Sequence, residues 1–293
     1  MTSNLSRPCP LCGGKPVGIG FPYRTKYNET IFSYLKCGTC LSVYVDPIPD
    51  GQTFTKMYAK VEYHDSHYMD CSVEPYVESA KLLKKYLPPS SRVLDYGCGM
   101  GVFLRALKNE GMTPFGIEFD DSAARYAREA TNCEVLSIAE FQALPEKPNF
   151  DAIHLGDVLE HLPNPVQTFY QLLDYLVPNG IIFIEGPLET NPSPVYWATR
   201  LYGVLKRLLK PDFVANHPPT HLFQTNAKQQ LATFMQFDEF IELKYWAVYE
   251  TGWPYNSTPG LKGAIAIAAL ALGGKRFLNF TFGNRFRAIF TRL

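Results

Sequence analysis

The 293-residue chain lacks a long hydrophobic run. Its longest apolar stretch, residues 261–272, contains Lys262 and Gly263, whereas a membrane-spanning helix needs roughly 20 predominantly apolar residues. Residues 1–10 are polar and include prolines, which is not the pattern of a secretory signal. These absences predict a cytoplasmic protein without a transmembrane helix.

The chain also lacks an excess of either charge. Lysine plus arginine and aspartate plus glutamate both number 28, which argues against a protein whose main task is to grip nucleic acid. The charge is unevenly spread, however. Residues 91–190 hold six basic and fifteen acidic side chains, and residues 191–293 hold twelve basic and five acidic ones. The basic final third favours an anionic partner.

Cysteines are few and do not suit a disulfide scaffold, because seven is an odd number. Four of them form two C-x-x-C pairs separated by 24 residues, Cys9 with Cys12 and Cys37 with Cys40. This spacing predicts a Zn²⁺ site in a reducing compartment. With cysteine at all four positions no place remains for water, so we expect a structural metal in a zinc ribbon over residues 1–50.

From residue 91, short apolar segments alternate with amphipathic ones. Strands are expected at residues 92–96, 114–119, 150–155 and 181–185, and helices at residues 102–110, 121–130 and 166–177. This alternation predicts an α/β fold with a doubly wound, mostly parallel sheet. Residues 240–249 and 285–291 have strand composition and would close the sheet as an antiparallel edge.

A glycine loop follows the first of these strands. Gly97, Gly99 and Gly101 would let the backbone approach a ligand at the N-terminus of the next helix, although packing of the strand against the helix is an alternative reason for them. Glu118 ends the second strand, where a carboxylate can accept ribose hydroxyls. The spacing G-x-G-x-G differs from the dinucleotide fingerprint, and Asp95 would repel a pyrophosphate but attract a sulfonium.

Four segments together resemble the successive motifs of class I S-adenosylmethionine-dependent methyltransferases. They are VLDYGCGMGVFL, GIEFDDSAARYAR, FDAIHLGDVLEHLPNP and LLDYLVPNGIIFIEGP. The segments CPLCG and YLKCGTCLSVYVDPIP resemble the zinc module that precedes this domain in a bacterial subgroup. That subgroup includes sugar C-methyltransferases and enzymes of polysaccharide or natural-product pathways. The resemblance implies a Rossmann-like seven-stranded sheet, S-adenosylmethionine as cofactor, and a small-molecule or saccharide acceptor.

The resemblance also implies roles for individual residues. Asp95, Gly97 and Gly99 would hold the methionine end of the cofactor, Glu118 the ribose hydroxyls, and Phe119 the adenine. The implied cofactor-binding set is completed by Cys98, Gly101 and Asp157. Members of the family often carry an aspartate for the adenine amino group after the third strand. Ile138 stands there in this chain, so backbone groups would recognise the adenine.

Histidine is the first candidate for a base, because a hydroxyl acceptor is helped by a group that titrates near neutrality. The candidate catalytic residues are His221, His161, Glu160 and Asp157. The last three resemble a stretch that binds a divalent cation in some related O-methyltransferases, so a second metal is an alternative reading. His154 lies within an apolar strand and is expected to be a core residue.

The remaining segments have looser assignments. Residues 51–90 are predicted as a helical, aromatic linker that packs against the sheet by default, or covers the cofactor as a lid with Tyr63, Tyr68 and Tyr76. Residues 91–293 would form the methyltransferase domain, with insertions at about 190–225 and 251–282. An amphipathic helix over residues 195–210 would cover the acceptor site, or contact a membrane or an anionic acceptor such as a nucleotide- or lipid-linked sugar.

Two other functions compete with this reading. One is an RNA methyltransferase whose zinc module binds RNA, but residues 1–50 hold only five basic against three acidic side chains and no basic cluster interleaved with aromatics. The other is a non-catalytic scaffold that binds S-adenosylmethionine. The intact set of Asp95, Gly97, Gly99 and Glu118 argues against it. The acceptor atom and the oligomeric state are not predicted.

Overall fold

The structure is a computed structural model that describes residues 6–21, 24–58 and 72–293. Tyr63 and Tyr68, two of the three tyrosines of the expected lid, lie outside the described residues. Tyr76, the third, lies in α3 (Glu74–Lys84) and packs against Phe103 with 6.1 Å between ring centroids.

A seven-stranded sheet forms the larger part of the molecule, in the order β12-β15-β9-β8-β5-β6-β7. Its five parallel strands are β5 (Arg92–Tyr96), β6 (Thr113–Glu118), β7 (Glu134–Ser137), β8 (Phe150–Gly156) and β9 (Leu176–Pro187). At one edge β15 (Arg285–Arg292) runs antiparallel to β9 and to β12 (Ile241–Tyr249). The predicted α/β sheet with an antiparallel closing edge is confirmed.

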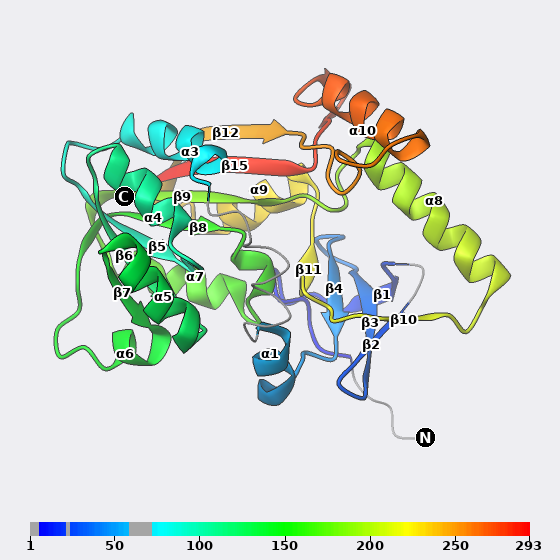
Figure 1. The fold of residues 1–293 in the computed structure, drawn as a ribbon. Coiled ribbons are helices and arrows are strands. Elements are labelled where there is room, and N and C mark those ends of the chain that lie inside the picture. Colours follow the sequence, from blue (N-terminus) through cyan, green and yellow to red (C-terminus); the bar gives the residue numbers. More distant parts are fainter. Residues whose placement is uncertain (1–5, 22–23, 59–71) are drawn as a thin grey trace.

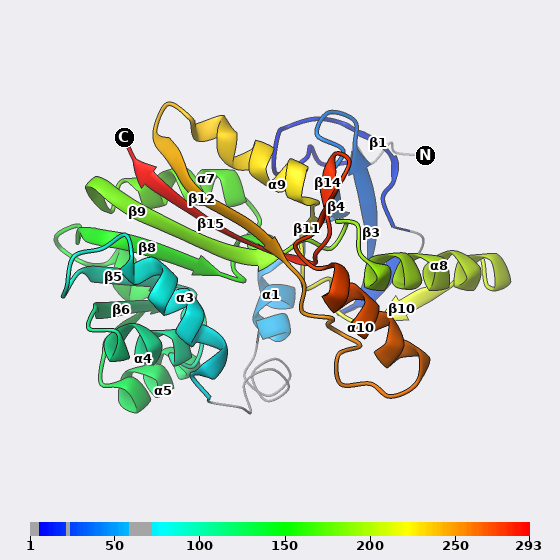
Figure 2. The same cartoon turned by 90° about the horizontal axis from the view of Figure 1, so that it is seen from above.

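Helices cover both faces of this sheet, as Figure 2 shows. On one face lie α3, α4 (Val102–Asn109) and α5 (Asp121–Thr131); on the other lie α7 (Pro165–Leu173) and α9 (Ala227–Phe234). The short α6 (Ile138–Gln142) follows β7. Along β9, Ile181 and Phe183 enter one core, and Ile182 and Ile184 enter the other. Successive strand residues face opposite sides, which is why a continuous apolar run suits a sheet covered on both faces.

A second, six-stranded sheet lies beside the first (Figure 1). Residues 1–50 supply β1 (Pro16–Ile19), β2 (Arg24–Tyr27), β3 (Thr30–Cys37) and β4 (Val43–Asp46). Its other two strands, β10 (Val214–Asn216) and β11 (Phe223–Gln224), come from the predicted insertion at 190–225 and pair with β2 and β4. The small sheet is therefore completed by a segment from far along the chain.

The two sheets share one hydrophobic core. Cys9, Leu11 and Tyr44 of the small sheet's module belong to the same buried cluster as Leu159 and Phe169. Burial of apolar surface contributes about 25 cal/mol per Å², so this shared cluster stabilises both parts together. Helix α1 (Gly51–Tyr58) follows the small sheet.

Two further helices extend from the body of the molecule. Helix α8 (Pro194–Leu209) and helix α10 (Leu261–Leu272) pack against each other, and α10 leads into the hairpin of β13 (Arg276–Phe277) and β14 (Phe280–Thr281). Figures 1 and 2 both show α8 projecting away from the sheets. Within the described residues, every helix is too short or too polar to cross a bilayer.

Candidate functional site

The candidate cofactor residues meet at the carboxyl ends of the parallel strands of the large sheet, called the cofactor edge below. Strands β8, β5 and β6 are direct neighbours and run parallel, so their carboxyl ends lie side by side. The glycine loop follows β5, Glu118 ends β6, and Asp157 follows β8. Ligands of doubly wound sheets bind at such an edge, which is where the sequence placed the cofactor.

Packing requires two of the three loop glycines. Gly97 has φ +85°, and a Cβ there would lie 2.6 Å from Cγ2 of Val158. Gly101 has φ +77°, and a Cβ there would lie 2.6 Å from Cγ2 of Thr131. A side chain at either position would thus be strained and would clash. Packing of the strand against the helix, the alternative reason given in the sequence analysis, therefore explains these two glycines whether or not the loop binds a ligand.

Hydrogen bonds fix the Glu118 carboxylate at the end of β6. Oε2 accepts from the backbone N–H of Gly99 at 2.8 Å, and Oε1 accepts from the N–H groups of Phe119 at 2.8 Å and Asp120 at 3.1 Å. This network ties the glycine loop to the start of α5. The Phe119 side chain is 53% exposed, so its ring is accessible to a planar ligand.

Cys98 points away from the loop. Its side chain packs among Leu104, Ala124 and Val135, and burial raises the pKa of its thiol well above the ordinary range. A contact between Cys98 and a cofactor would therefore come from its backbone.

Asp95 belongs to a buried network that the sequence analysis missed. Its Oδ1 lies 2.7 Å from Nδ1 of His154, and Nε2 of His154 lies 3.3 Å from Oε1 of Glu185. Oε2 of Glu185 accepts hydrogen bonds from Ser79 Oγ at 2.8 Å and Arg287 Nε at 2.7 Å. His154 is a core residue, as expected. The register of β5 with β8 places His154 opposite Asp95, and the sequence alone does not give this register.

The two carboxylates keep His154 charged. Burial alone would lower the pKa of His154, but the hydrogen bonds and charges of Asp95 and Glu185 outweigh it and raise the pKa to about 9. Burial likewise opposes ionisation of Glu185, yet its bond to His154 and the charges of His154 and Arg287 lower its pKa to about 2. At neutral pH an imidazolium thus lies between two carboxylates.

Asp157 is held by the antiparallel edge of the sheet. Both of its carboxylate oxygens accept from an Nη of Arg285, at 2.8 and 2.7 Å. Its own backbone has φ +54°. Burial alone would lower the pKa of Arg285, but the negative charge of Asp157 outweighs burial. The pKa of this guanidinium therefore lies above its ordinary value. This ion pair was not predicted.

The other three candidate catalytic residues come together where the two sheets meet. Glu160 and His161 lie in the 3-10 turn η1 (Leu159–His161) after β8, and His221 precedes β11. Each of the three offers a ligand atom within 4.8 Å of the others. Leu222 joins the sheets here, because its N–H donates to the Glu160 carbonyl at 2.6 Å and its carbonyl accepts from Val45 N–H at 2.9 Å.

Neighbouring groups contact Nδ1 of both imidazoles and so orient the two rings. Nδ1 of His161 lies 2.8 Å from the Thr220 carbonyl and 2.9 Å from the Tyr58 hydroxyl, and its Nε2 lies 4.0 Å from Oε1 of Glu160. Nδ1 of His221 pairs closely with the Glu189 carboxylate. Burial would lower the pKa of His221, but Glu189 raises it to about 9. The ring is 30% exposed, so water screens part of this attraction.

Glu160 is a buried carboxyl with one unused oxygen. Its side chain is 5% exposed, and Oε1 has no hydrogen-bond partner among the described residues. Burial raises the pKa of Glu160 to about 8, and the negative charge of Asp157 adds to the effect. Such an orphaned oxygen is costly unless something binds it.

A cleft of about 160 Å³ opens beside these histidines. Both aromatic and polar side chains line it: Phe21, Tyr34, His217, Thr220, His221 and Gln224. A chain of ring contacts connects His221 with His161 (4.9 Å), His161 with Tyr58 (5.7 Å), and Tyr58 with Phe119 (6.4 Å). Side-chain ring contacts therefore link the histidine cluster to Phe119, which follows β6.

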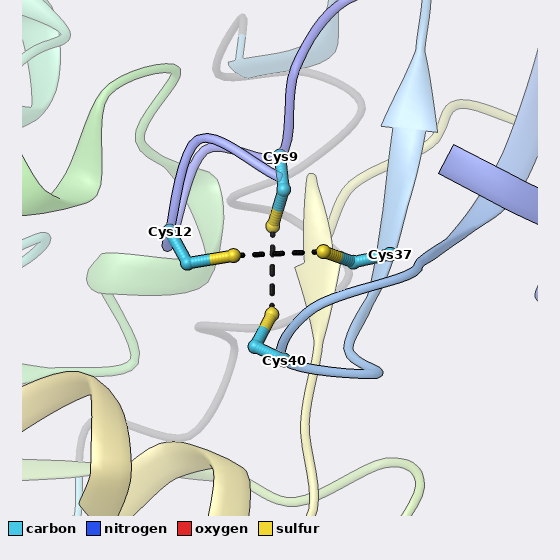
Figure 3. A group of neighbouring side chains, drawn as sticks. All are labelled: Cys9, Cys12, Cys37 and Cys40. Atoms are coloured by element: carbon cyan, nitrogen blue, oxygen red, sulfur yellow. Dashed lines mark hydrogen bonds between the residues drawn. The ribbon is translucent and has the colours of Figure 1, made fainter. Parts of the chain in front are cut away.

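The four cysteines converge in the small sheet's module (Figure 3). Cys9 Sγ lies 3.7 Å from Cys40 Sγ, and Cys12 Sγ lies 3.5 Å from Cys37 Sγ. Four thiolates around a tetrahedral Zn²⁺, at about 2.3 Å each, are separated by about 3.8 Å. The donor set and its spacing thus fit this metal.

Comparison with known proteins shows the family and the fold of the larger part of the chain. Residues 67–237, more than half of the chain, match a family model described as a methyltransferase domain. A chain from the complex between the Haloferax volcanii Trm112 methyltransferase activator and a methyltransferase has the same fold. It is 15% identical, with a TM-score of 0.50, and the match covers 74% of this chain and 90% of that one.

Curated relatives are similar over a shorter stretch. The ubiquinone biosynthesis O-methyltransferase of Alkalilimnicola ehrlichii is 30% identical over 114 residues, which cover 36% of this chain and 45% of the relative. The enzyme of the same name from Xanthomonas campestris is 29% identical over 131 residues, covering 41% and 53%. The chain thus spans about half the length of the curated relatives it matches.

Proposed function

We propose that this chain, which belongs to the methyltransferase-domain family, transfers a methyl group from S-adenosylmethionine to a hydroxyl of a small-molecule acceptor bound in the cleft beside His221. The observation that carries the proposal is the series of ring contacts that links Phe119 through Tyr58 and His161 to His221. A saccharide is one acceptor class that suits a cleft with both aromatic and polar walls. The relatives named as O-methyltransferases favour oxygen as the acceptor atom.

Residues of the cofactor edge would hold S-adenosylmethionine. Glu118 stands at the strand end where a ribose binds, and Phe119 offers an exposed ring for the adenine. Asp95 and the backbone of the glycine loop would take the methionine end. When bound, the cofactor supplies an electrophilic methyl group on a sulfonium, and the protein supplies alignment and a base.

His221 would act as the base in this proposal. Because Glu189 raises its pKa to about 9, His221 is mostly protonated at neutral pH, and only its neutral form can accept a proton. The rate of methyl transfer should therefore increase as the pH rises toward 9. Glu189 fixes the tautomer by holding Nδ1, so Nε2 is the nitrogen that takes the proton from the acceptor hydroxyl. The Glu189 carboxylate then stabilises the imidazolium that forms. His161, whose ring packs edge-on against His221, would position it.

The first experiment separates cofactor binding from turnover. Calorimetry should show that wild-type protein binds S-adenosylmethionine and that Glu118→Ala weakens binding at least tenfold. Glu134→Ala, an exposed carboxylate on β7, is the control and should leave the affinity unchanged. No heat with wild-type protein at millimolar cofactor would overturn the cofactor assignment.

The second experiment tests the base. With methyl-labelled cofactor and a panel of phenols and nucleotide-linked sugars as acceptors, His221→Ala should lower kcat by about 10²-fold. The affinity for S-adenosylmethionine should change less than about twofold. Full activity in His221→Ala would rule this residue out as the base. Methylation of bulk RNA, together with a shift of RNA mobility at physiological salt, would favour the RNA methyltransferase instead.

A divalent cation at Glu160, His161 and His221 is a second candidate for the chemistry. His221 takes the place that the sequence analysis gave to Asp157, which pairs with Arg285 instead. The orphaned Oε1 of Glu160 favours it, and two histidines with one carboxylate form a recognised metal-binding set. In that arrangement Glu189 and the Thr220 carbonyl would hold the outer nitrogens of the two rings. Metal analysis decides: two metals per chain, with one lost in Glu160→Gln, supports the cation, and one metal in both proteins excludes it.

We also propose that the four cysteines bind a structural Zn²⁺. The fit of the sulfur distances to a tetrahedral site supports this. Cysteine at all four positions leaves no position for a substrate, so the metal would stabilise the module rather than take part in methyl transfer.

A further inference from the structure

Helices α8 and α10 bury very little of their own surface. Of the 16 residues of α8 only Val195 and Gly203 are buried, and of the 12 residues of α10 only Ala266 and Ala269. The two helices touch each other, and Trp197 of α8 packs edge-on against Phe282 at 5.9 Å. Residues 194–210 and 253–282 together are called the α8–α10 surface below.

The α8–α10 surface exposes many large apolar side chains. Leu209 is 82% exposed and Leu261 is 79% exposed. Others in the same two segments are also exposed: Trp197, Leu201, Tyr202, Val204, Leu205, Leu208, Trp253, Ile267, Leu270, Phe277 and Leu278. Scattered apolar residues are normal on a protein surface, but a cluster of this size marks an interaction site.

The charge of the α8–α10 surface has one sign. Its two segments contain seven basic side chains and no acidic ones: Arg200, Lys206, Arg207, Lys210, Lys262, Lys275 and Arg276. Lys206 Nζ lies 3.9 Å from the centroid of the Phe213 ring, and Lys262 Nζ lies 5.6 Å from that of Tyr255. Cations are thus held beside aromatic rings at an apolar surface, an arrangement typical of a membrane interface.

The charge and the apolar exposure of the α8–α10 surface together distinguish between its possible binding partners. A second copy docking through the same surface would bring seven positive charges against seven, which opposes association. Nucleic acid would match the charge but would leave the exposed leucines in water. An anionic bilayer matches both, because its headgroups pair with the cations while the apolar side chains enter the acyl boundary. We propose that the α8–α10 surface docks the protein on an anionic lipid bilayer.

The docking surface is connected to the site through the chain itself. Helix α8 begins five residues after Glu189, and His221 follows the helix by way of β10. The two residues of the Glu189–His221 pair therefore flank the segment that would lie on the lipid. The proposal concerns where the protein docks, and it does not depend on which acceptor is methylated.

Sedimentation with vesicles tests the proposal. Wild-type protein should pellet with vesicles of phosphatidylcholine and 30% phosphatidylglycerol and stay in the supernatant with phosphatidylcholine alone. The bound fraction should fall steeply at 0.5 M NaCl, because salt screens the attraction. The emission of Trp197 and Trp253 should shift to the blue on binding.

Matched variants identify the surface. Leu208→Glu/Leu209→Glu should lower the bound fraction at least tenfold, and so should Lys206→Glu/Arg207→Glu. Leu293, which is 65% exposed and lies outside the α8–α10 surface, is the control, and Leu293→Glu should bind as wild type does. Calorimetry with S-adenosylmethionine on each variant checks the fold, and its result is separate from the lipid result.

Three outcomes would overturn the proposal. In the first, the anionic vesicles do not retain wild-type protein, or they retain it no better than vesicles of phosphatidylcholine alone. The leucine variant binds as well as wild type. Without lipid, sedimentation equilibrium finds a dimer that Leu208→Glu/Leu209→Glu abolishes, which would identify a second copy as the occupant.

Discussion

At the scale of single residues, Gly97 has two reasons to lack a side chain. Its φ of +85° penalises any L-residue, and Val158 occupies the place of a Cβ. Gly111 has nearly the same φ, +82°, but nothing within 4 Å of its Cβ position. The pair therefore separates the cost of the backbone conformation from the cost of the clash.

We expect Gly111→Ala to cost about 1 kcal/mol of unfolding free energy, from backbone strain alone. Gly97→Ala should cost a further 1–3 kcal/mol, roughly, because β-branched Val158 has to move. Urea denaturation measures both values, and calorimetry should show that only Gly97→Ala loses S-adenosylmethionine. Equal destabilisation by the two substitutions would mean that Val158 yields without cost.

The buried His154 gives folding stability a dependence on pH. Its pKa is about 9 in the folded protein, above its ordinary value of 6.5, so its contribution is complete below pH 6.5 and is lost as the pH rises through 9. The loss should be on the order of 3 kcal/mol. Glu185 has the opposite sign. Its contribution is present above its ordinary pKa of 4.5 and is lost as the pH falls toward 2.

Denaturation at pH 6.5 and pH 9.5 measures the His154 effect. The comparison is best made in a His221→Asn background, because the pKa of His221 is raised in the same range. In the His221→Asn background, the protein that keeps His154 should lose stability between pH 6.5 and pH 9.5. The protein that also carries His154→Gln should lose far less. Parallel losses in the two proteins would assign the pH dependence to other groups.

At the scale of secondary-structure elements, β11 links the cysteine module to the catalytic candidates. It pairs with β4, which begins three residues after Cys40, and it begins two residues after His221. A change at the cysteines should therefore reach the histidine loop through a few backbone hydrogen bonds.

Cys37→Ser is the substitution that tests this link. We expect it to remove one zinc per chain, because a buried thiolate ligand is lost, and to lower Tm. Hydrogen exchange should speed up in residues 214–224 as well as near the cysteines. Cys133→Ser, which lies outside the cluster, should leave the zinc content unchanged. Unchanged exchange in residues 214–224 would contradict the link.

The elements that the sequence predicted are those with a strong pattern of their own. Continuous apolar runs marked β5, β6, β8 and β9, and β12 and β15 were expected as the closing pair. In contrast, β10 has three residues and β11 has two, which is too short for any periodicity. Their conformation depends on hydrogen bonds to strands about 180 residues away, so tertiary contacts decide it.

For the candidate site, too, the sequence indicated only what local patterns carry. Residues that stand next to a motif, such as Gly97, Glu118 and His161, could be proposed from local spacing. The partners of Asp95 and His221 could not, because His154 and Glu189 are distant in the sequence and become neighbours only through strand register or loop closure.

At the scale of the whole molecule, the shared core should make the two sheets unfold together. Cys9 and Leu11 belong to the same buried cluster as Phe169, and Gln236 Nε2 donates to the Leu11 carbonyl at 3.1 Å. Scanning calorimetry should give one transition, and a chelator should move that transition to lower temperature. Two separate transitions, with only one sensitive to the chelator, would show that the modules fold independently.

The strand order of the small sheet has a consequence for synthesis on the ribosome. Residues 1–50 emerge first, yet β2 and β4 lack their edge partners until residues 214–224 have been translated. During that interval the nascent chain carries two open strand edges, and such edges readily pair with other chains. A ribosome stalled before residue 214 should therefore display a protease-sensitive amino-terminal segment that becomes resistant once residue 224 has cleared the exit tunnel.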